Sequence, residues 1–192
     1  MTKSISSFIV FVLVALGLIG GIILVRRQQE TRRQAAGFAP AEVYIQPATS
    51  DVSQADQTVQ VELRADVGNE RAGAFDLRLS FNPSQLEVVE AVINSTVFTQ
   101  TLANEADNNQ GRLEIGGLLI ANSQSDMPTG DIKLADITVE VKQSGRLSFD
   151  TNYNNGVTGY NPGGDNHFDL TFSGADFSLH SITPNQSFSA SF

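Results

Sequence analysis

The sequence has no cysteine and no tryptophan, and only two of its 192 residues are histidine. Without cysteine the chain cannot form disulfides, use thiol chemistry or bind zinc through sulfur. Without tryptophan, and with only three tyrosines, it lacks the row of exposed aromatic rings that stacks on a flat polysaccharide surface. These absences exclude several common kinds of site and leave the redox compartment undecided.

Basic residues are scarce beyond the N-terminal segment. Residues 1–37 hold five of the twelve lysines and arginines but one of the twenty-one acidic residues, so the remainder carries a formal charge of about −13. Such an acidic domain repels nucleic acid and anionic lipid headgroups. We therefore expect no nucleic-acid partner.

One long apolar run lies near the N-terminus. Residues 8–25, FIVFVLVALGLIGGIILV, carry no charge and span roughly 27 Å as a helix, close to the thickness of a bilayer core. A cleaved signal peptide is the alternative, but RRQQETRRQ follows the run where a small-x-small cleavage site would lie. The sequence predicts five regions: a short tail (1–7), a transmembrane α-helix in the lipid bilayer (8–25), an Arg/Gln-rich linker (26–40), one domain (41–181) and a flexible tail (182–192).

The predicted domain consists of short apolar runs separated by turn residues. Residues 74–81, AFDLRLSF, place an apolar side chain at every second position, which is the period of a half-buried strand. The Asn-Pro-Ser at 82–84 predicts a tight turn. Strands are expected at 42–47, 58–67, 74–81, 88–97, 112–120, 131–142, 146–150, 167–172 and 175–180. Because no helical period follows residue 40, we predict an all-β protein, an antiparallel β-sandwich of eight or nine strands behind one transmembrane helix.

Two of these strands contain irregularities, and two segments are expected to be loops. Gly116-Gly117 predicts a bulge or a close approach of another backbone. The apolar positions change parity between Leu134 and Ile137, which also predicts a bulge. Residues 99–109 are expected to form a polar loop with a helical turn at most, and residues 151–166 a Gly/Asn-rich loop.

The segment around residue 80 resembles a known family. Residues 73–89, GAFDLRLSFNPSQLEVV, are similar to the central motif of cohesin-type domains, GF-x-F-x-L-x-Y-D-P-x-x-L-E-V, with Asn82 in place of the usual Asp and Phe81 in place of the usual Tyr. A weaker likeness extends from about residue 43 to residue 179. The resemblance implies a cohesin-like jelly roll, in a superfamily that includes carbohydrate-binding modules. It also implies a dockerin-like partner protein, held on one sheet face by polar contacts around a small apolar centre.

Two features of the sequence predict opposite orientations of the anchor in the membrane. One lysine precedes the apolar run and four arginines follow it, which by the positive-inside rule places the domain in the cytoplasm. The domain itself is rich in Asn, Ser, Thr and Gly and resembles modules that work outside cells, as on bacterial surface cohesin-like proteins with short N-terminal anchors. We expect a single-pass protein of the cell membrane with an extracellular domain.

Residues that could carry catalysis or bind metal are few. His167 lies between Asp165 and Asp169 and could act as a base or a metal ligand, or be a solvated loop residue. Asp150, Asp165 and Asp169, with nearby asparagines, are candidate calcium ligands, although their spacing is not that of an EF-hand and turn chemistry explains the same composition. No nucleophile elbow, zinc motif or phosphate loop is present. We therefore predict no enzyme activity and no required cofactor.

Two groups of residues are candidates for ligand binding. Tyr153 and Tyr160 flank Asn154 and Asn155 in one loop, where rings and amides could hold a glycan. Asp76 and Arg78 lie on the polar side of residues 74–81, where a protein partner could dock or where the sheet face is simply solvated.

The function predicted from these features is a membrane-anchored cell-surface module for non-covalent recognition of a protein or glycan, and hence for adhesion. One alternative is a carbohydrate-binding module of a polysaccharide-associated system. Another is a structural subunit of the envelope or of a filament.

Overall fold

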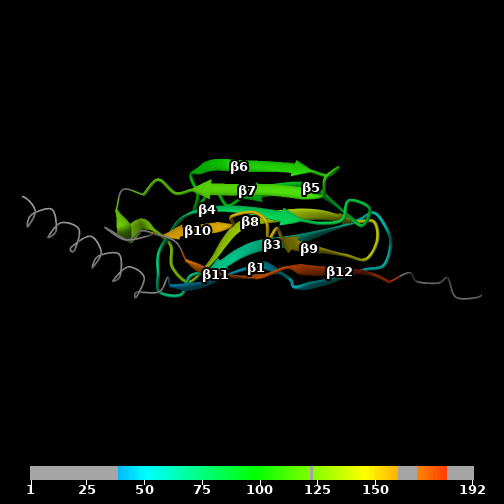
Figure 1. The fold of residues 1–192 in the computed structure, drawn as a ribbon, viewed down its shortest axis with the longest axis horizontal. Helices are drawn as coiled ribbons and strands as arrows, with labels where there is room; N and C mark the ends of the chain where they lie inside the picture. The colour runs from blue at the N-terminus through cyan, green and yellow to red at the C-terminus, as the bar shows by residue number, and fades with distance from the viewer. Residues whose placement is uncertain (1–38, 122, 160–167, 181–192) are drawn as a thin grey trace, which may run out of the picture. The chain divides into compact units, whose positions relative to one another are not determined.

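The computed structural model describes residues 39–121, 123–159 and 168–180, which form strands and one short 3₁₀ helix (Figure 1). The elements are β1 (Pro40–Gln46), β2 (Thr49–Val52), β3 (Gln57–Asp66), β4 (Ala72–Ser80), β5 (Leu86–Ile93), β6 (Gln100–Asp107), β7 (Arg112–Leu118), η1 (Gln124–Asp126), β8 (Asp131–Val141), β9 (Gly145–Phe149), β10 (Gly156–Gly159), β11 (Asp169–Ser173) and β12 (Ala175–Leu179).

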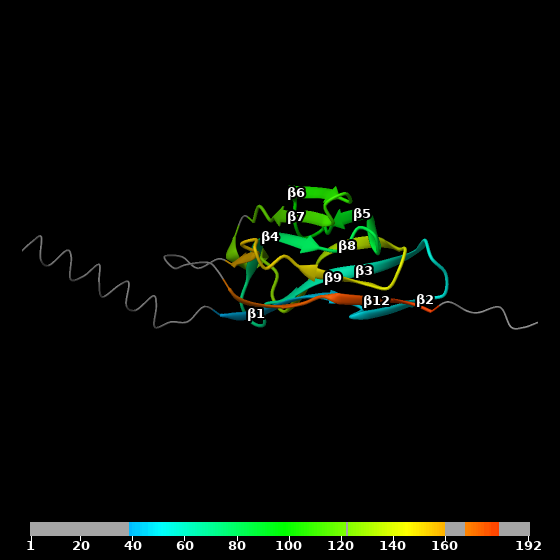
Figure 2. The same cartoon turned by 45° about the vertical axis from the view of Figure 1, so that its right-hand side comes forward.

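These strands form two sheets. One has the order β11-β1-β3-β8-β5. The other runs β2-β12-β9-β4-β7-β6, with β10 also paired to β4, and its order can be followed from β6 at the top to β2 at the bottom of Figure 2. All neighbours are antiparallel except β1 with β11 and β2 with β12. The predicted all-β sandwich is confirmed.

Apolar side chains from the inner faces of both sheets form the core. The strict alternation of β4 buries Phe75, Leu77 and Leu79 and leaves the residues between them partly or fully exposed. The largest side chains that are almost fully buried are Phe75, Phe177, Ile45, Leu63, Leu77, Leu79, Leu86, Leu113, Ile115, Leu134, Ile137 and Leu147. Among the described residues no polar or charged residue is buried, so polar groups gather on the outer faces and in the loops.

Each of the nine predicted strands has a counterpart in the structure, and three further strands were not predicted. The expected polar loop at 99–109 was wrong, because β6 occupies Gln100–Asp107. The expected loop at 151–166 was wrong in part, because β10 pairs with β4 over Gly156–Gly159. The third strand that was not predicted is the four-residue edge strand β2. These three strands have little apolar alternation because each is short or lies at a sheet edge.

Both predicted irregularities are present. On β8, the register with β3 shifts next to Leu134, and Leu134 and Ala135 are buried in succession. On β7, the Gly116-Gly117 pair lies opposite a shift in β6. A Cβ on Gly117 would approach the ring of Phe75 to 2.8 Å, so glycine is needed there for close packing.

The predicted turn after β4 is also confirmed. Asn82 accepts, through its side-chain Oδ1, a hydrogen bond from the backbone N–H of Ser84 at 3.0 Å, and its carbonyl accepts one from Gln85 at 2.9 Å. An asparagine side chain that bonds two residues ahead closes this kind of turn. The turn therefore sets where β5 begins.

The predicted membrane segment (residues 8–25), residues 26–38 of the linker and the tail at 182–192 lie outside the described residues, and the last linker residue, Pro40, begins β1. Within the part of the chain that the structure describes, no helix has the length and apolarity needed to cross a bilayer.

Candidate functional site

The outer face of the seven-stranded sheet carries rows of side chains that cross β4, β7 and β6. Residues directly opposite one another in neighbouring strands point to the same face. The register gives three such rows, here called the β4–β7–β6 face: Asp76–Gly116–Ala103, Arg78–Glu114–Glu105 and Ser80–Arg112–Asp107.

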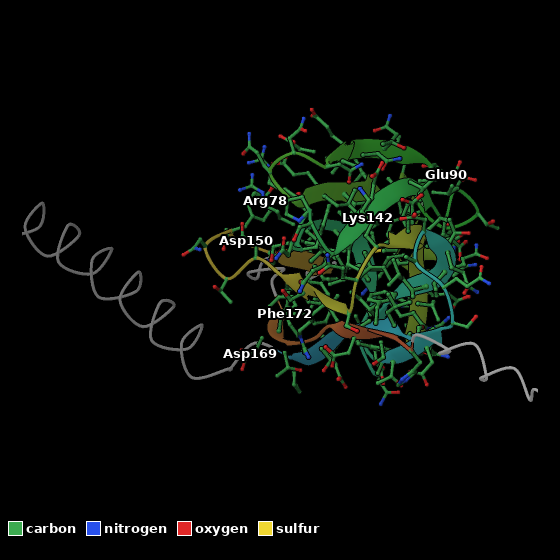
Figure 3. All side chains as sticks on the ribbon, turned by 90° about the vertical axis from the view of Figure 1, so that its right-hand side faces the viewer. Arg78, Glu90, Lys142, Asp150, Asp169 and Phe172 are labelled. Atoms are coloured by element: carbon green, nitrogen blue, oxygen red, sulfur yellow. The ribbon has the colours of Figure 1, made fainter. Side chains whose placement is uncertain are left out.

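Arg78 lies on β4, in the middle row of this face. Its guanidinium group bonds the carboxylate of Glu114 on β7 and lies 3.9 Å from the carboxylate of Asp150. Its carbon Cζ lies 4.1 Å from the centre of the Tyr153 ring. A planar guanidinium can bond carboxylates at its edge while its face stacks on an aromatic ring. These contacts hold Arg78 in one orientation, on the same side of the molecule as Asp150 (Figure 3).

Tyr153 connects this cluster to the next row. Its hydroxyl donates a hydrogen bond of 2.7 Å to the Asp76 carboxylate. That hydrogen bond and partial burial raise the pKa of Tyr153 above its ordinary value of 10.0, because the ionised phenol would face a carboxylate and lose water. The site therefore favours the neutral phenol form of Tyr153.

The raised pKa predicts how this contact responds to pH. A group whose pKa is raised on folding contributes stability below its ordinary pKa and loses it as pH rises through the folded value. We expect tyrosinate absorbance to show one tyrosine titrating above pH 10.0 in the wild type that is missing in Tyr153→Phe. Because the pKa of Tyr44 is raised as well, the difference between the two titrations isolates Tyr153. A difference curve centred at or below pH 10.0 would contradict the contact.

Asn155 fixes the loop that carries Tyr153. Along the edge of β4, β9 pairs with Leu79 and Ser80, and β10 pairs with residues from Asp76 back to Ala72, so Arg78 lies between the two. The Asn155 side-chain oxygen accepts a 2.7 Å hydrogen bond from the Arg78 backbone N–H, and its amide nitrogen donates one of 2.7 Å to the Asp150 carbonyl. One amide side chain thus bridges the gap between two strands.

Asn155→Ala is expected to lower the free energy of unfolding by about 1–3 kcal/mol, because it leaves the partly buried Arg78 N–H without its partner and removes one of the two hydrogen bonds to the Asp150 carbonyl. Asn154→Ala is the matched control, since Asn154 is exposed and its side chain makes no hydrogen bond with another described residue. The control should stay within about 0.5 kcal/mol of wild type. Urea unfolding followed by tyrosine fluorescence measures both, and equal effects of the two variants would refute the bridging role.

An apolar strip borders the charged rows of the same face. Leu102 is the extra residue of the β6 bulge and is 57% exposed, and Ile120, just after β7, is 59% exposed. A Cβ on Gly116 would lie 3.5 Å from the Leu102 Cβ, so Leu102 covers the surface that this glycine leaves open. Leu118, opposite Ala74 and partly exposed, continues the strip. The face therefore combines an apolar strip, an arginine and an aromatic ring with a charged rim.

The outer face of the five-stranded sheet is a closed ion-pair network. Arg64 donates to both oxygens of Asp131 and to Glu62, and these bonds raise its pKa. Lys133 is bonded to Asp136 at 3.0 Å. Val92, 49% exposed, is set opposite Asp136 among these charges. Tyr44 lies opposite Arg64, so this face also carries an arginine next to an aromatic ring. Among the described residues, however, its exposed Val92 stands between charged side chains, whereas an apolar centre beside an arginine and an aromatic ring is typical of protein interfaces.

The structure brings four of the six predicted binding residues into one cluster, namely Asp76, Arg78, Tyr153 and Asn155. Asn154 lies in the same loop and, like Tyr153 and Asn155, lines a hollow described below. Tyr160 lies outside the described residues.

Of the calcium candidates, the structure describes Asp150 and Asp169, and it does not bring these two together. Asp150 and Asp169 lie apart in Figure 3, with Phe172 between them. The carboxylate of Asp150 accepts a hydrogen bond from the Asn152 backbone N–H at 2.9 Å, as in an ordinary turn. Asp165 and His167 lie outside the described residues. In the described ranges no group of three or more acidic or histidine side chains could hold a metal ion.

Two important residues were missing from the sequence-based site. Glu114 holds Arg78 from the neighbouring strand, and Leu102 supplies one of the two most exposed side chains of the apolar strip. The alternation of polar and apolar residues at 112–115 indicates that the Glu114 side chain points outward. Its pairing with Arg78 depends on which strands are neighbours, which the sequence does not show. The role of Leu102 could not be predicted from the sequence, because residues 99–109 were expected to form a loop rather than strand β6.

The comparisons with known proteins agree with this architecture. Residues 43–185 match the model of the cohesin domain. The chain is similar to the OlpC cohesin in a type I cohesin–dockerin complex from Clostridium thermocellum, at a TM-score of 0.61 and 11% identity over 77% of this chain and 97% of that one. CaCohA2 from Clostridium acetobutylicum gives a TM-score of 0.59 and 14% identity over 77% and 95% of the two chains.

A non-cellulosomal cohesin from the hyperthermophilic archaeon Archaeoglobus fulgidus is also similar, at a TM-score of 0.55 and 15% identity over 74% of this chain and 93% of that one. No curated protein matches the chain in sequence. The structural likeness supports the fold, and the family model covers most of the chain, including the β4 motif. The chain therefore belongs to the cohesin domain family.

Proposed function

We propose that the protein is a membrane-anchored cell-surface module that binds a dockerin-like partner protein through the β4–β7–β6 face. The observation that carries the proposal is the apolar strip of Leu102, Leu118 and Ile120 beside the fixed Arg78–Tyr153 pair. Apolar side chains in the middle of an interface supply most of its affinity, and arginine and tyrosine are the residues most often found at such positions.

The similar solved cohesins support a protein partner over other ligands. The OlpC cohesin from Clostridium thermocellum and a ScaC cohesin from Acetivibrio cellulolyticus were each solved in complex with a dockerin. A flat sheet face of three strands also suits a partner of comparable size, since a standard interface buries roughly 800 Å² on each side.

The charges around the strip set the chemistry of the partner. Asp76, Glu114, Glu105 and Asp107 outnumber the two arginines of the three rows. A partner with lysine or arginine at its rim and an apolar centre complements this surface. Association should therefore slow as salt is raised, because such rim charges mainly steer the encounter.

The membrane anchor and the outward orientation belong to the same proposal. Residues 8–25 would hold the protein in the bilayer, and residues 26–40 would separate the domain from it. Protease treatment of intact cells tests the orientation. Cleavage of the domain without lysis is the expected result, and cleavage only after lysis would place the domain in the cytoplasm and exclude a surface partner.

The binding proposal is tested with the full chain in a detergent that has no sugar headgroup. Dockerin modules encoded in the same genome are titrated into it by calorimetry. We expect at least one module to bind with a Kd of about 1 μM or tighter, which corresponds to about −8 kcal/mol. If no module binds at concentrations of roughly 100 μM, the proposal that the β4–β7–β6 face binds a dockerin-like partner is overturned.

A further inference from the structure

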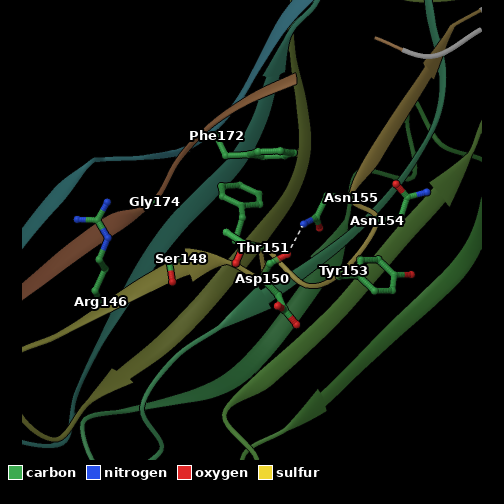
Figure 4. A pocket seen from close by; sticks show the side chains of 10 residues that line it. Arg146, Ser148, Asp150, Thr151, Tyr153, Asn154, Asn155, Phe172 and Gly174 are labelled. Atoms are coloured by element: carbon green, nitrogen blue, oxygen red, sulfur yellow. Dashed lines mark hydrogen bonds between the residues drawn. The ribbon is translucent and has the colours of Figure 1, made fainter. Parts of the chain in front are cut away.

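A hollow of about 380 Å³ opens beside the loop that follows β9 (Figure 4). Phe172 and Phe149 form one wall, and Thr151, Asn154 and Ser148 lie on the rim. The volume is at the lower end of the range for small-molecule sites, which is roughly 300–1,000 Å³. The hollow is thus large enough for one or two sugar rings and too small for a folded partner.

The aromatic wall has one free ring. Phe149 is almost fully buried, whereas Phe172 is 40% exposed, and the ring centres are 4.8 Å apart. Phe172 lies on edge strand β11 opposite Val43, a core position, so its side chain is on the inner side of the sheet, where the sheet edge leaves part of the ring exposed. Phe149 packs on this ring at an interplanar angle of 38°, and the exposed part of the Phe172 ring lines the hollow.

The rim offers neutral hydrogen-bonding groups. The side chains of Thr151 and Asn154 make no hydrogen bond with another described residue. The charged residues of the rim are already engaged, since Arg146 donates to both oxygens of Asp176, at 3.0 and 2.8 Å, and Asp150 bonds within its own turn. A ligand there would be bound by hydroxyl and amide groups next to an aromatic face, without a free cation to attract an anion.

We propose that this hollow binds a neutral saccharide whose pyranose ring stacks on Phe172 and whose hydroxyl groups bond Asn154 and Thr151. A β-linked glucose-type ring suits the wall, because its hydroxyls are equatorial and its two faces present C–H groups that pack on an aromatic ring. The acidic charge of the domain disfavours uronic and sialic acids. The site adjoins the β4–β7–β6 face, because Asp150, Tyr153 and Asn155 line the hollow as well as contacting Arg78, whereas Leu102 does not line it.

The alternative occupant, an apolar side chain of a partner protein, would leave the hydroxyl and amide groups of the rim without hydrogen bonds, which is unfavourable once water is excluded. The saccharide uses the wall and the rim together. For this reason the polar rim favours the sugar.

The test is saturation-transfer NMR on the full chain in a detergent without a sugar headgroup, with cellobiose and N,N′-diacetylchitobiose as probes. Each disaccharide is supplied at about 10 mM, since shallow sites of this kind bind with a Kd of roughly 1 mM. We expect transfer to the ring protons of at least one of them. Phe172→Ala should weaken binding at least tenfold, whereas Phe172→Tyr, which keeps the aromatic face, should retain it.

Asn154→Ala provides a second variant that leaves the core untouched, and it should weaken binding severalfold. Leu102→Asp, on the adjoining face, should bind sugar as the wild type does. Absence of transfer to both disaccharides, or transfer that is unchanged in Phe172→Ala and Asn154→Ala, overturns the proposal. Because dockerin binding is measured separately, failure here does not affect the protein-binding proposal.

Discussion

Phe75→Ala is expected to lower the free energy of unfolding by about 3–5 kcal/mol, the cost of removing a large aromatic side chain from a packed core. Phe75 is 1% exposed and meets Phe98 edge to face, with ring centres 4.8 Å apart. Its ring also covers Gly117 on β7, where no side chain can expand to fill the space. The cavity therefore persists, and a domain of typical stability, about 5–15 kcal/mol, loses a large part of it.

Phe172→Ala is the matched control for this prediction, because it removes the same side chain from an exposed position. It should cost about 1 kcal/mol or less, since Phe172 packs on Phe149 over only part of its ring. Urea unfolding of both variants of the full chain, followed by tyrosine fluorescence, compares them. Similar losses in both variants would mean that the core is not centred on Phe75.

Leu102→Asp is expected to weaken the affinity for a dockerin-like partner by about 100-fold, because a charge would replace one of the two most exposed side chains of the apolar strip. Truncation of a central interface residue costs roughly 2 kcal/mol or more, and an uncompensated carboxylate adds a desolvation penalty. The variant should fold normally, since Leu102 is 57% exposed and stands in a bulge.

Val92→Asp is the control for Leu102→Asp. Val92 is similarly exposed, at 49%, on the outer face of the other sheet. Its substitution also replaces an exposed aliphatic side chain with a carboxylate. Calorimetric titration should give wild-type affinity for this variant. If Val92→Asp abolished binding and Leu102→Asp left it intact, the docking face would be the five-stranded sheet.

Much of the fold could be predicted because its strongest strands obey simple rules. In β4, three large apolar residues at alternate positions, followed by Phe81 and an Asn-Pro turn, leave few alternatives. β6 could not be predicted in this way, since QTLANEAD contains one large apolar residue and that residue lies in a bulge. An edge strand with a solvated face has little need of apolar alternation.

The site was predicted in part, for reasons that are visible in individual residues. Asp76 and Arg78 could be predicted because they occupy the polar positions of an alternating strand. Tyr153 and Asn155 could be predicted because their loop combines aromatic rings with amide side chains. That these groups meet depends on β9 and β10 flanking Arg78, which no local pattern indicates. Glu114 and Leu102 come from neighbouring strands, so their contribution depends on strand order and register rather than on local sequence.

The central claim is that the β4–β7–β6 face docks a partner protein. Hydrogen–deuterium exchange of the full chain, with and without the dockerin module that binds it most tightly, tests this most directly. The edge strand β6 has backbone amides that no neighbouring strand protects, so a partner lying over it should slow their exchange. The account predicts new protection in β6 and β7 and none in β5 or β8. Protection confined to β5 and β8, with β6 unchanged, would contradict it.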